Sequence, residues 1–111
     1  VAISSNDIQN YPQDRPEKMK ILWSDLKLDF PYLFDQTQEV AKSFKAECTP
    51  EFYVFDTNNV LTYRGRADDS SPNSGTPSGI DLTIAMRNTI NGQKVDIEQH
   101  PSMGCNIKWK S

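Results

Sequence analysis

The most informative segment of this 111-residue chain reads Glu47-Cys48-Thr49-Pro50-Glu51-Phe52-Tyr53-Val54-Phe55-Asp56. A proline has no N–H to donate to a sheet ladder, so Pro50 belongs at the first residue of a strand or in a special turn. The run behind it is rich in aromatic and β-branched residues and predicts a strand over residues 51–55. X-Pro is also the one kind of peptide bond that readily adopts the cis form.

A second strand follows after a short polar turn. Thr57-Asn58-Asn59 separates the first strand from a further β-rich run over residues 60–66. Two strands joined by a tight Asn-rich turn form an antiparallel hairpin. Residues 67–79 then predict a long exposed loop, a kind of segment that often carries function. The charged residues around it are Arg64, Arg66, Asp68 and Asp69. The two carboxylates could serve acid/base chemistry, but surface ion pairs are the favoured interpretation.

The rest of the chain alternates strands with amphipathic helices. We expect strands at residues 1–3 and within 28–34, each followed by a helix, and a third helix after the loop. The expected helix caps are Asp14, then Asp35 or Thr37, then Ser78, and Gly92 ends the third helix. The apolar residues expected to face inward are Met19, Leu22, Trp23, Leu26, Val40, Ala41, Phe44, Leu82, Ala85, Met86 and Ile90.

The resulting element order is β-α-β-α-β-β-α. Strands that alternate with helices indicate parallel βαβ units, and the hairpin adds antiparallel strands. The length is that of one domain. We therefore expect a single α/β domain over residues 1–111, with a mixed sheet flanked by helices.

Composition excludes several classes of protein. Twelve basic and fifteen acidic residues give a net charge of −3, which is unlike the basic surface of a nucleic-acid-binding domain. No run approaches the ~18 apolar residues of a membrane-spanning helix. Two cysteines, Cys48 and Cys105, are too few for a disulfide scaffold and lack zinc-ligand spacing. We expect a soluble, cytoplasmic protein with no nucleic-acid or membrane partner, and with no metal or organic cofactor.

Several segments together resemble the redoxin branch of the thioredoxin superfamily, close to its peroxiredoxin-like members. The segments that carry the resemblance are residues 1–7, Phe30-Pro31-Tyr32-Leu33-Phe34-Asp35, Gln38-Glu39-Val40-Ala41-Lys42, Cys48-Thr49-Pro50-Glu51-Phe52, Tyr63-Arg64-Gly65-Arg66 with Asp68-Asp69-Ser70, and Pro101-Ser102-Met103-Gly104-Cys105-Asn106-Ile107-Lys108-Trp109. The resemblance spans essentially the whole chain. It implies a thioredoxin-like fold.

One departure from that family concerns its redox cysteines. In the family they stand at the start of a helix, where the N-terminus favours the thiolate, and that helix precedes the strand beginning here at Val1. This chain has no Cys-x-x-Cys. The resemblance therefore implies that the first strand and first helix of the family fold are missing and that the chain is an incomplete, weakly active portion. The missing strand would leave unpaired edges, which favour a homodimer.

The resemblance also implies roles for the residues around Pro50. The Thr49-Pro50 bond would be cis and would face the redox site, with Thr49 and Pro50 binding substrate. Cys48 would lie near the redox centre, and the alternative is a buried, inert thiol. Cys105 is the second candidate redox or resolving thiol. It would form a disulfide with Cys48 or resolve an upstream cysteine.

Two functions from different classes are compatible with these features. The first, implied by the resemblance, is a thiol–disulfide oxidoreductase or thiol-dependent peroxidase, whose partners are a thiol or disulfide protein and a peroxide. The second is a non-catalytic thioredoxin-fold module that binds extended polypeptide through the cis-proline groove or a strand edge.

Overall fold

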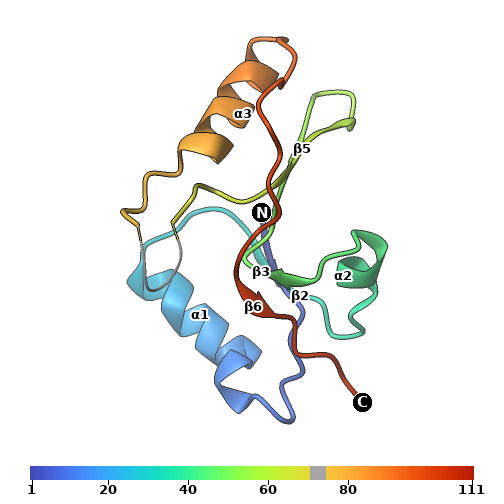
Figure 1. Cartoon of the computed structure of the whole chain (residues 1–111). Coiled ribbons are helices and arrows are strands. Elements are labelled where there is room, and N and C mark those ends of the chain that lie inside the picture. Colours follow the sequence, from blue (N-terminus) through green and yellow to red (C-terminus); the bar gives the residue numbers. More distant parts are fainter. Residues whose placement is uncertain (71–74) are drawn as a thin grey trace. The chain divides into compact units, whose positions relative to one another are not determined.

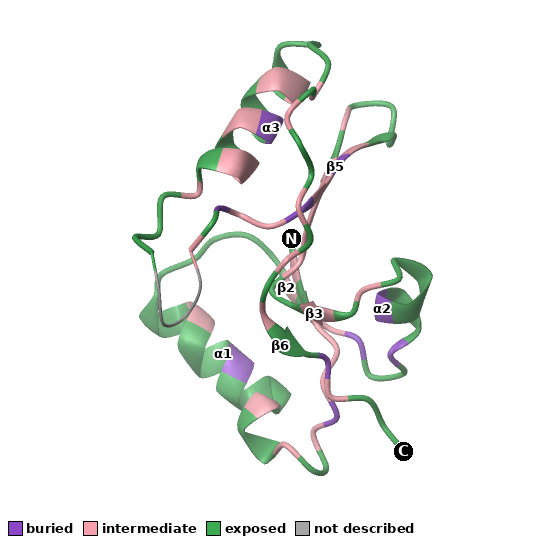
Figure 2. Ribbon diagram, in the orientation of Figure 1, coloured by how far each residue is buried: buried purple, intermediate pink, exposed green. Residues whose placement is uncertain are grey.

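The computed structural model describes residues 1–70 and 75–111, which form two compact units (Figure 1). The first unit consists of Val1–Glu47 with Ile107–Ser111, and the second of Cys48–Asn106. Buried residues are few and are spread over both units (Figure 2). No described helix is long and apolar enough to cross a membrane.

The first unit contains a parallel βαβ arrangement followed by a short helix. Its two strands pair with Ile3 opposite Leu33. Parallel strands need a crossover connection, and a helix supplies it here as the sequence predicted. The elements of this unit are β1 (Ala2–Ser4), the 3-10 turn η1 (Pro12–Asp14), α1 (Pro16–Asp25), β2 (Tyr32–Phe34) and α2 (Glu39–Ser43).

Helix α1 begins with Pro16 in its first turn, a position where the missing N–H costs nothing. The expected cap at Asp14 is wrong. The N-cap residue is Arg15, which makes no side-chain capping bond, while the Asp14 carboxylate accepts a hydrogen bond from Asn6 Nδ2 at 3.1 Å. Of the predicted inward face only Met19 is fully buried; Trp23 is half-buried, and Leu22 and Leu26 are exposed.

The interior of the first unit is largely polar. The Asp35 carboxylate accepts hydrogen bonds from the Ser5 hydroxyl at 2.8 Å and from the N–H groups of Val40 and Ala41 at 3.3 and 2.9 Å. It thereby satisfies the start of α2, as the sequence predicted, although the N-cap residue itself is Gln38. Burial acts to raise the pKa of Asp35, but these hydrogen bonds outweigh it and hold the pKa below the ordinary value.

Gln38 connects three distant parts of the first unit. Its Nε2 donates to the carbonyls of Ser5 at 2.6 Å and Lys108 at 3.0 Å, and its Oε1 accepts the N–H of Lys110 at 3.0 Å. The side chain is only 2% exposed. The last residues of the chain are therefore held to this unit by a buried amide.

The second unit is built around the predicted hairpin. The Asp56 carboxylate closes its turn by accepting the N–H groups of Asn58 at 2.8 Å and Val60 at 3.0 Å. Tyr63 and Ala85 form the centre, at 1% and 0% exposure. The elements of this unit are β3 (Cys48–Thr49), β4 (Phe52–Phe55), β5 (Leu61–Gly65), α3 (Ile80–Ile90) and β6 (Cys105–Asn106).

Helix α3 has the predicted length but a narrower buried face. Ala85 is buried, whereas Met86 is 42% and Ile90 83% exposed. The N-cap residue is Gly79, and Ser78 acts from one position earlier, where its Oγ accepts the Ile80 N–H at 3.4 Å. Gly92 follows the helix at φ +67°, the left-handed conformation that glycine supplies at a helix end.

The described strands do not form the single mixed sheet that the sequence predicted. They form three two-stranded ladders: β1 with β2, β3 with β6, and β4 with β5. Each of these strands pairs with one other strand among the described residues. The parallel pair and the hairpin agree with the prediction. The short strands β3 and β6 are additions to the predicted element order, and the described residues show no single sheet that joins the three ladders.

Candidate functional site

The candidate site lies at the short ladder of β3 and β6 in the second unit. The two strands run antiparallel, with Cys48 opposite Asn106 and Thr49 opposite Cys105. The Thr49-Pro50 peptide bond is cis, as expected. Thr49, Pro50 and Cys105 are all exposed. Cys48, Thr49 and Cys105 thus lie together on one two-stranded ladder, and Pro50 follows it directly.

The two thiols point to opposite faces of this ladder. Residues directly opposite each other share a face, and the next pair along lies on the other face. Cys48 therefore shares a face with Asn106, and Cys105 with Thr49. Both cysteines are free. The register opposes the Cys48–Cys105 disulfide that was one interpretation of the sequence.

Cys48 is half-buried, and its Sγ donates a hydrogen bond to the carbonyl of Ser102 at 3.2 Å. The alternative of a fully buried Cys48 is therefore not met, because the residue is only half-buried. Cys105 has no such cover and is exposed. An external reagent or partner therefore has readier access to Cys105 than to Cys48.

Gly104 lies directly against the Thr49-Pro50 peptide. A Cβ at this position would overlap the Thr49 carbonyl carbon, at 2.6 Å, as well as its oxygen, and would lie 3.2 Å from the Pro50 nitrogen. Backbone atoms cannot give way as a flexible side chain can. Only glycine lets the chain pass this close to the peptide.

Residues 100–106, here called the tail segment, follow the end of β5 toward β3. The Arg66 N–H donates to the His100 carbonyl at 3.1 Å, and the Ser102 hydroxyl donates to the Gly65 carbonyl at 2.9 Å. A Cβ on Gly65 would lie 2.5 Å from the His100 carbonyl oxygen. Within the second unit, the tail segment thus contacts β5 and the Thr49-Pro50 step closely through backbone atoms at two glycines, Gly65 and its own Gly104.

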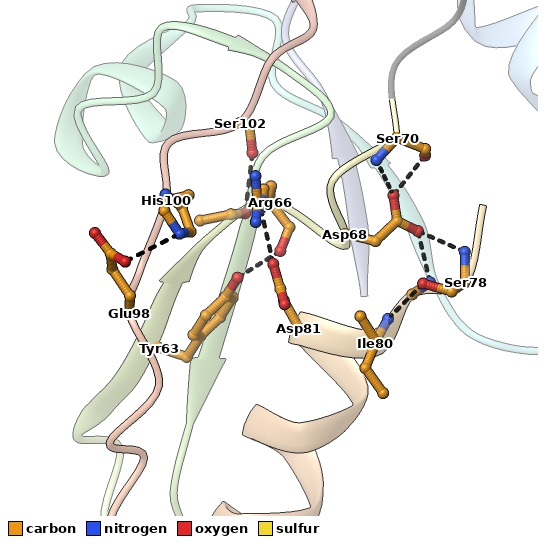
Figure 3. Close-up of polar contacts among 12 residues, drawn as sticks. Tyr63, Arg66, Asp68, Ser70, Ser78, Ile80, Asp81, Glu98, His100 and Ser102 are labelled. Carbon is orange, nitrogen blue, oxygen red and sulfur yellow. Dashed lines mark hydrogen bonds and ion pairs between the residues drawn. The ribbon is translucent and has the colours of Figure 1, made fainter. Parts of the chain in front are cut away.

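An ion pair stands beside the tail segment (Figure 3). Arg66 Nε donates to the Asp81 carboxylate at 2.7 Å, which raises the pKa of the guanidinium. The hydroxyl of Tyr63 donates to the Arg66 carbonyl. Burial of Tyr63, together with the charge of Asp81, raises the pKa of the phenol. These contacts join β5 to α3, and through the neighbouring Arg66 N–H they position His100.

Asp68 has a larger role than the expected surface ion pair. Its side chain is buried, and its carboxylate accepts hydrogen bonds from the hydroxyl and N–H of Ser70 and from the N–H groups of Ser78 and Gly79 (Figure 3). These bonds, that from the Ser70 hydroxyl first, lower the pKa of Asp68 well below its ordinary range. The carboxylate ties the described ends of the 67–79 loop to the start of α3. The remainder of that loop, residues 71–74, lies outside the described residues.

Sequence reasoning assigned no individual role to Ser102 or Gly104, and it treated Asp68 as a surface charge. The first two lie in the motif Pro101-Ser102-Met103-Gly104-Cys105, which drew attention through its family resemblance alone. Nothing local reveals that Gly104 meets a peptide 55 positions earlier in the chain. A cluster able to hold a metal ion, with three or more His, Cys, Asp or Glu side chains, is absent from residues 1–70 and 75–111.

Comparison with known proteins identifies the family of this chain. The sequence profile described as Redoxin matches residues 2–81, which include the Thr49-Pro50 step. The chain belongs to the Redoxin family. No curated protein matches the sequence.

Two solved structures are similar to this redoxin. An uncharacterized conserved protein from Geobacillus kaustophilus is 50% identical with a TM-score of 0.93; the match covers 99% of this chain and 59% of that one. A hypothetical protein from Sinorhizobium meliloti 1021 is 41% identical with a TM-score of 0.95; the match covers 100% of this chain and 61% of that one. The redoxin chain thus spans about three fifths of each relative. The matches establish a thioredoxin-like fold of mixed helices and strands.

Proposed function

We propose that this redoxin takes part in thiol-based redox chemistry, as a thiol–disulfide oxidoreductase or a thiol-dependent peroxidase. The observation that carries the proposal is the position of Cys105. Its exposed thiol lies in register opposite Thr49, beside Pro50, in a chain that belongs to the Redoxin family. A partner polypeptide that reached the Thr49-Pro50 step would meet this thiol.

The peroxidase step begins with attack of a cysteine thiolate on a hydroperoxide. The sulfur takes up one oxygen and becomes a sulfenic acid, and the peroxide leaves as an alcohol or as water. A second thiol then attacks the sulfenic sulfur, a disulfide forms and water leaves. In the exchange reaction the thiolate instead attacks a partner disulfide, and one partner thiolate leaves.

The second thiol is expected to come from a partner protein. Cys48 and Cys105 lie on opposite faces of the β3–β6 ladder, so neither can resolve the other while the ladder holds its register. Both thiols stand on strands. Neither cysteine lies in the first turn of a helix, where N–H groups favour the thiolate. We therefore expect stoichiometric oxidation with slow turnover for this chain alone.

Hydrogen peroxide oxidation followed by trapping of the sulfenic acid tests the proposal. The chain and its Cys48→Ser and Cys105→Ser variants are treated at neutral pH with one equivalent of peroxide and a dimedone probe. Mass spectrometry then locates the adduct. We expect the adduct at Cys105, retained in Cys48→Ser and lost in Cys105→Ser. Oxidation no faster than that of a free cysteine peptide at either position would refute the redox function.

A second candidate function is a module that binds extended polypeptide without chemistry. The observation that favours it is that β3, at Thr49, accepts an antiparallel strand, which is how sheet edges recognise extended chains. Such a module would bind peptide equally well with both cysteines replaced by serine. The oxidoreductase would lose its covalent partner exchange in that double variant.

A further inference from the structure

The tail segment occupies the edge at which β3 would meet a partner. We propose that this segment is a ligand built into the chain, bound intramolecularly at Thr49, and that an extended polypeptide with glycine at the position of Gly104 competes with it for the same edge. The proposal deepens the second candidate function and rests on it. Figure 1 shows β6, which lies near the C-terminus of the sequence, beside β3.

The first argument is the fit of Gly104. Its backbone lies so close to the Thr49-Pro50 peptide that even a single methyl group would overlap the Thr49 carbonyl. The next residue, Cys105, pairs with Thr49. An occupant of this edge therefore needs glycine at one position and tolerates an exposed side chain at the next. The edge therefore selects a sequence with glycine followed by a residue whose side chain can be exposed, and Gly104-Cys105 of this chain has that sequence.

The second argument is the way the tail segment is held. No residue from 100 to 106 is buried: His100, Ser102 and Gly104 are half-buried, and Met103 is 58% exposed. Burial of apolar side chains is the main source of stability for a permanent strand. This segment instead relies on backbone pairing and on the two hydrogen bonds of Ser102. An arrangement of this kind is suited to exchange, because backbone pairing can be offered equally by another chain.

The third argument is that release of the segment changes a thiol. Ser102 accepts the Cys48 hydrogen bond through its carbonyl while its hydroxyl donates to Gly65. When the segment leaves, Cys48 loses both this acceptor and part of its cover. The reactivity of Cys48 therefore reports whether the edge is occupied.

The experiment uses the full chain with Cys105→Ser, so that Cys48 is the sole thiol. Two probe peptides carry the sequence of residues 101–107 with serine in place of the cysteine; in one of them alanine also replaces the glycine. Iodoacetamide alkylation measures Cys48 access, and fluorescence anisotropy measures peptide binding. Three further variants are compared in this background: Gly104→Ala, Ser102→Ala, and Met103→Ala as a control at an exposed neighbour.

We expect Gly104→Ala to speed Cys48 alkylation and to permit binding of the glycine peptide, which then restores protection. The alanine peptide should do neither. Ser102→Ala removes one hydrogen bond without a clash and should raise the alkylation rate about fivefold. Met103→Ala should behave like the parent chain.

Equal binding of the two peptides, or no binding by any folded variant, would overturn the proposal. So would an alkylation rate that Ser102→Ala and Gly104→Ala leave unchanged. If Gly104→Ala does not fold, Ser102→Ala and the two peptides decide the question alone. Because no probe peptide carries a thiol, failure here is separate from failure of the peroxide assay, which reads oxidation of the parent chain.

Discussion

Replacing Gln38 by glutamate keeps the shape of a buried side chain but exchanges its hydrogen-bond donor, the amide Nε2, for an acceptor oxygen. In the native chain Nε2 donates to the carbonyls of Ser5 and Lys108, and Oε1 accepts the Lys110 N–H. Glutamate retains the acceptor, but it places a second oxygen against the two carbonyl oxygens. Both carbonyls lose their donor at a site where the side chain is only 2% exposed.

The expected loss of stability follows from those contacts. Two lost hydrogen bonds cost about 2 kcal/mol, and an unpaired buried oxygen adds about 1–3 kcal/mol. We therefore expect Gln38→Glu to lower the free energy of unfolding by about 3–5 kcal/mol at neutral pH. Protonation restores one donor, so the folded state raises the pKa of the new carboxyl. A folded state that binds the extra proton gains stability as the pH falls.

Urea unfolding at pH values near 7 and near 4.5 measures both effects. With an m-value of about 2 kcal/mol/M, the midpoint should drop by roughly 2 M at neutral pH and recover in part on acidification. Gln36→Glu is the matched control, because Gln36 is exposed two positions away. Trypsin should also cut faster after Lys108 in Gln38→Glu. The reasoning fails if the two variants unfold within ~0.5 kcal/mol of each other.

Three further predictions concern other contacts. Because hydrogen bonds hold the pKa of Asp35 below its ordinary 3.8, the stability it contributes is complete above that value and is lost as the pH falls through the lower, folded pKa. The stability difference between the native chain and Asp35→Asn should therefore shrink on acidification, and a pH-independent difference would contradict this. Tyr63→Phe removes the bond to the Arg66 carbonyl and should cost about 1 kcal/mol, or about 4 °C in thermal midpoint; an unchanged midpoint would exclude a role for the hydroxyl. Gly92→Ala should cost about 1 kcal/mol because its φ is +67°, and Gly92→Asn less. Thermal unfolding that ranks alanine above asparagine would show that the conformation at the end of α3 is misassigned.

Local patterns predict the hairpin and the three helices. The run after Pro50 and the Asn-rich turn lie within a dozen residues of each other, and Asp56 closes the turn through its own neighbours. The same kind of local reasoning placed Asp35 at the start of α2 correctly. It failed at Asp14, because the competing partner Asn6 stands eight positions away and outside the helix.

The short strands β3 and β6 were beyond the reach of pattern reasoning. Each has two residues, and alternation needs a run of about four or more residues before it can be recognised. Their pairing joins Cys48 to Asn106, which are 58 positions apart. Sequence reasoning could therefore bring the Thr49-Pro50 step and both thiols into one hypothesis, but it could not tell on which face each thiol lies. Gly104 was visible only as part of a family motif.

Because the two thiols lie on opposite faces of the ladder, a Cys48–Cys105 disulfide depends on the register of β6 against β3. In the native ladder Thr49 stands opposite Cys105. Sliding β6 by one residue would bring Cys48 opposite Cys105 and move Gly104 to the position across from Thr49, since a one-step slip exchanges the two faces of a strand. A disulfide formed in the slipped state would lock it, and reduction would let the native pairing return. The close contact of Gly104 with the Thr49-Pro50 peptide therefore favours the native register. In that register the two sulfur atoms stay on opposite faces of the ladder.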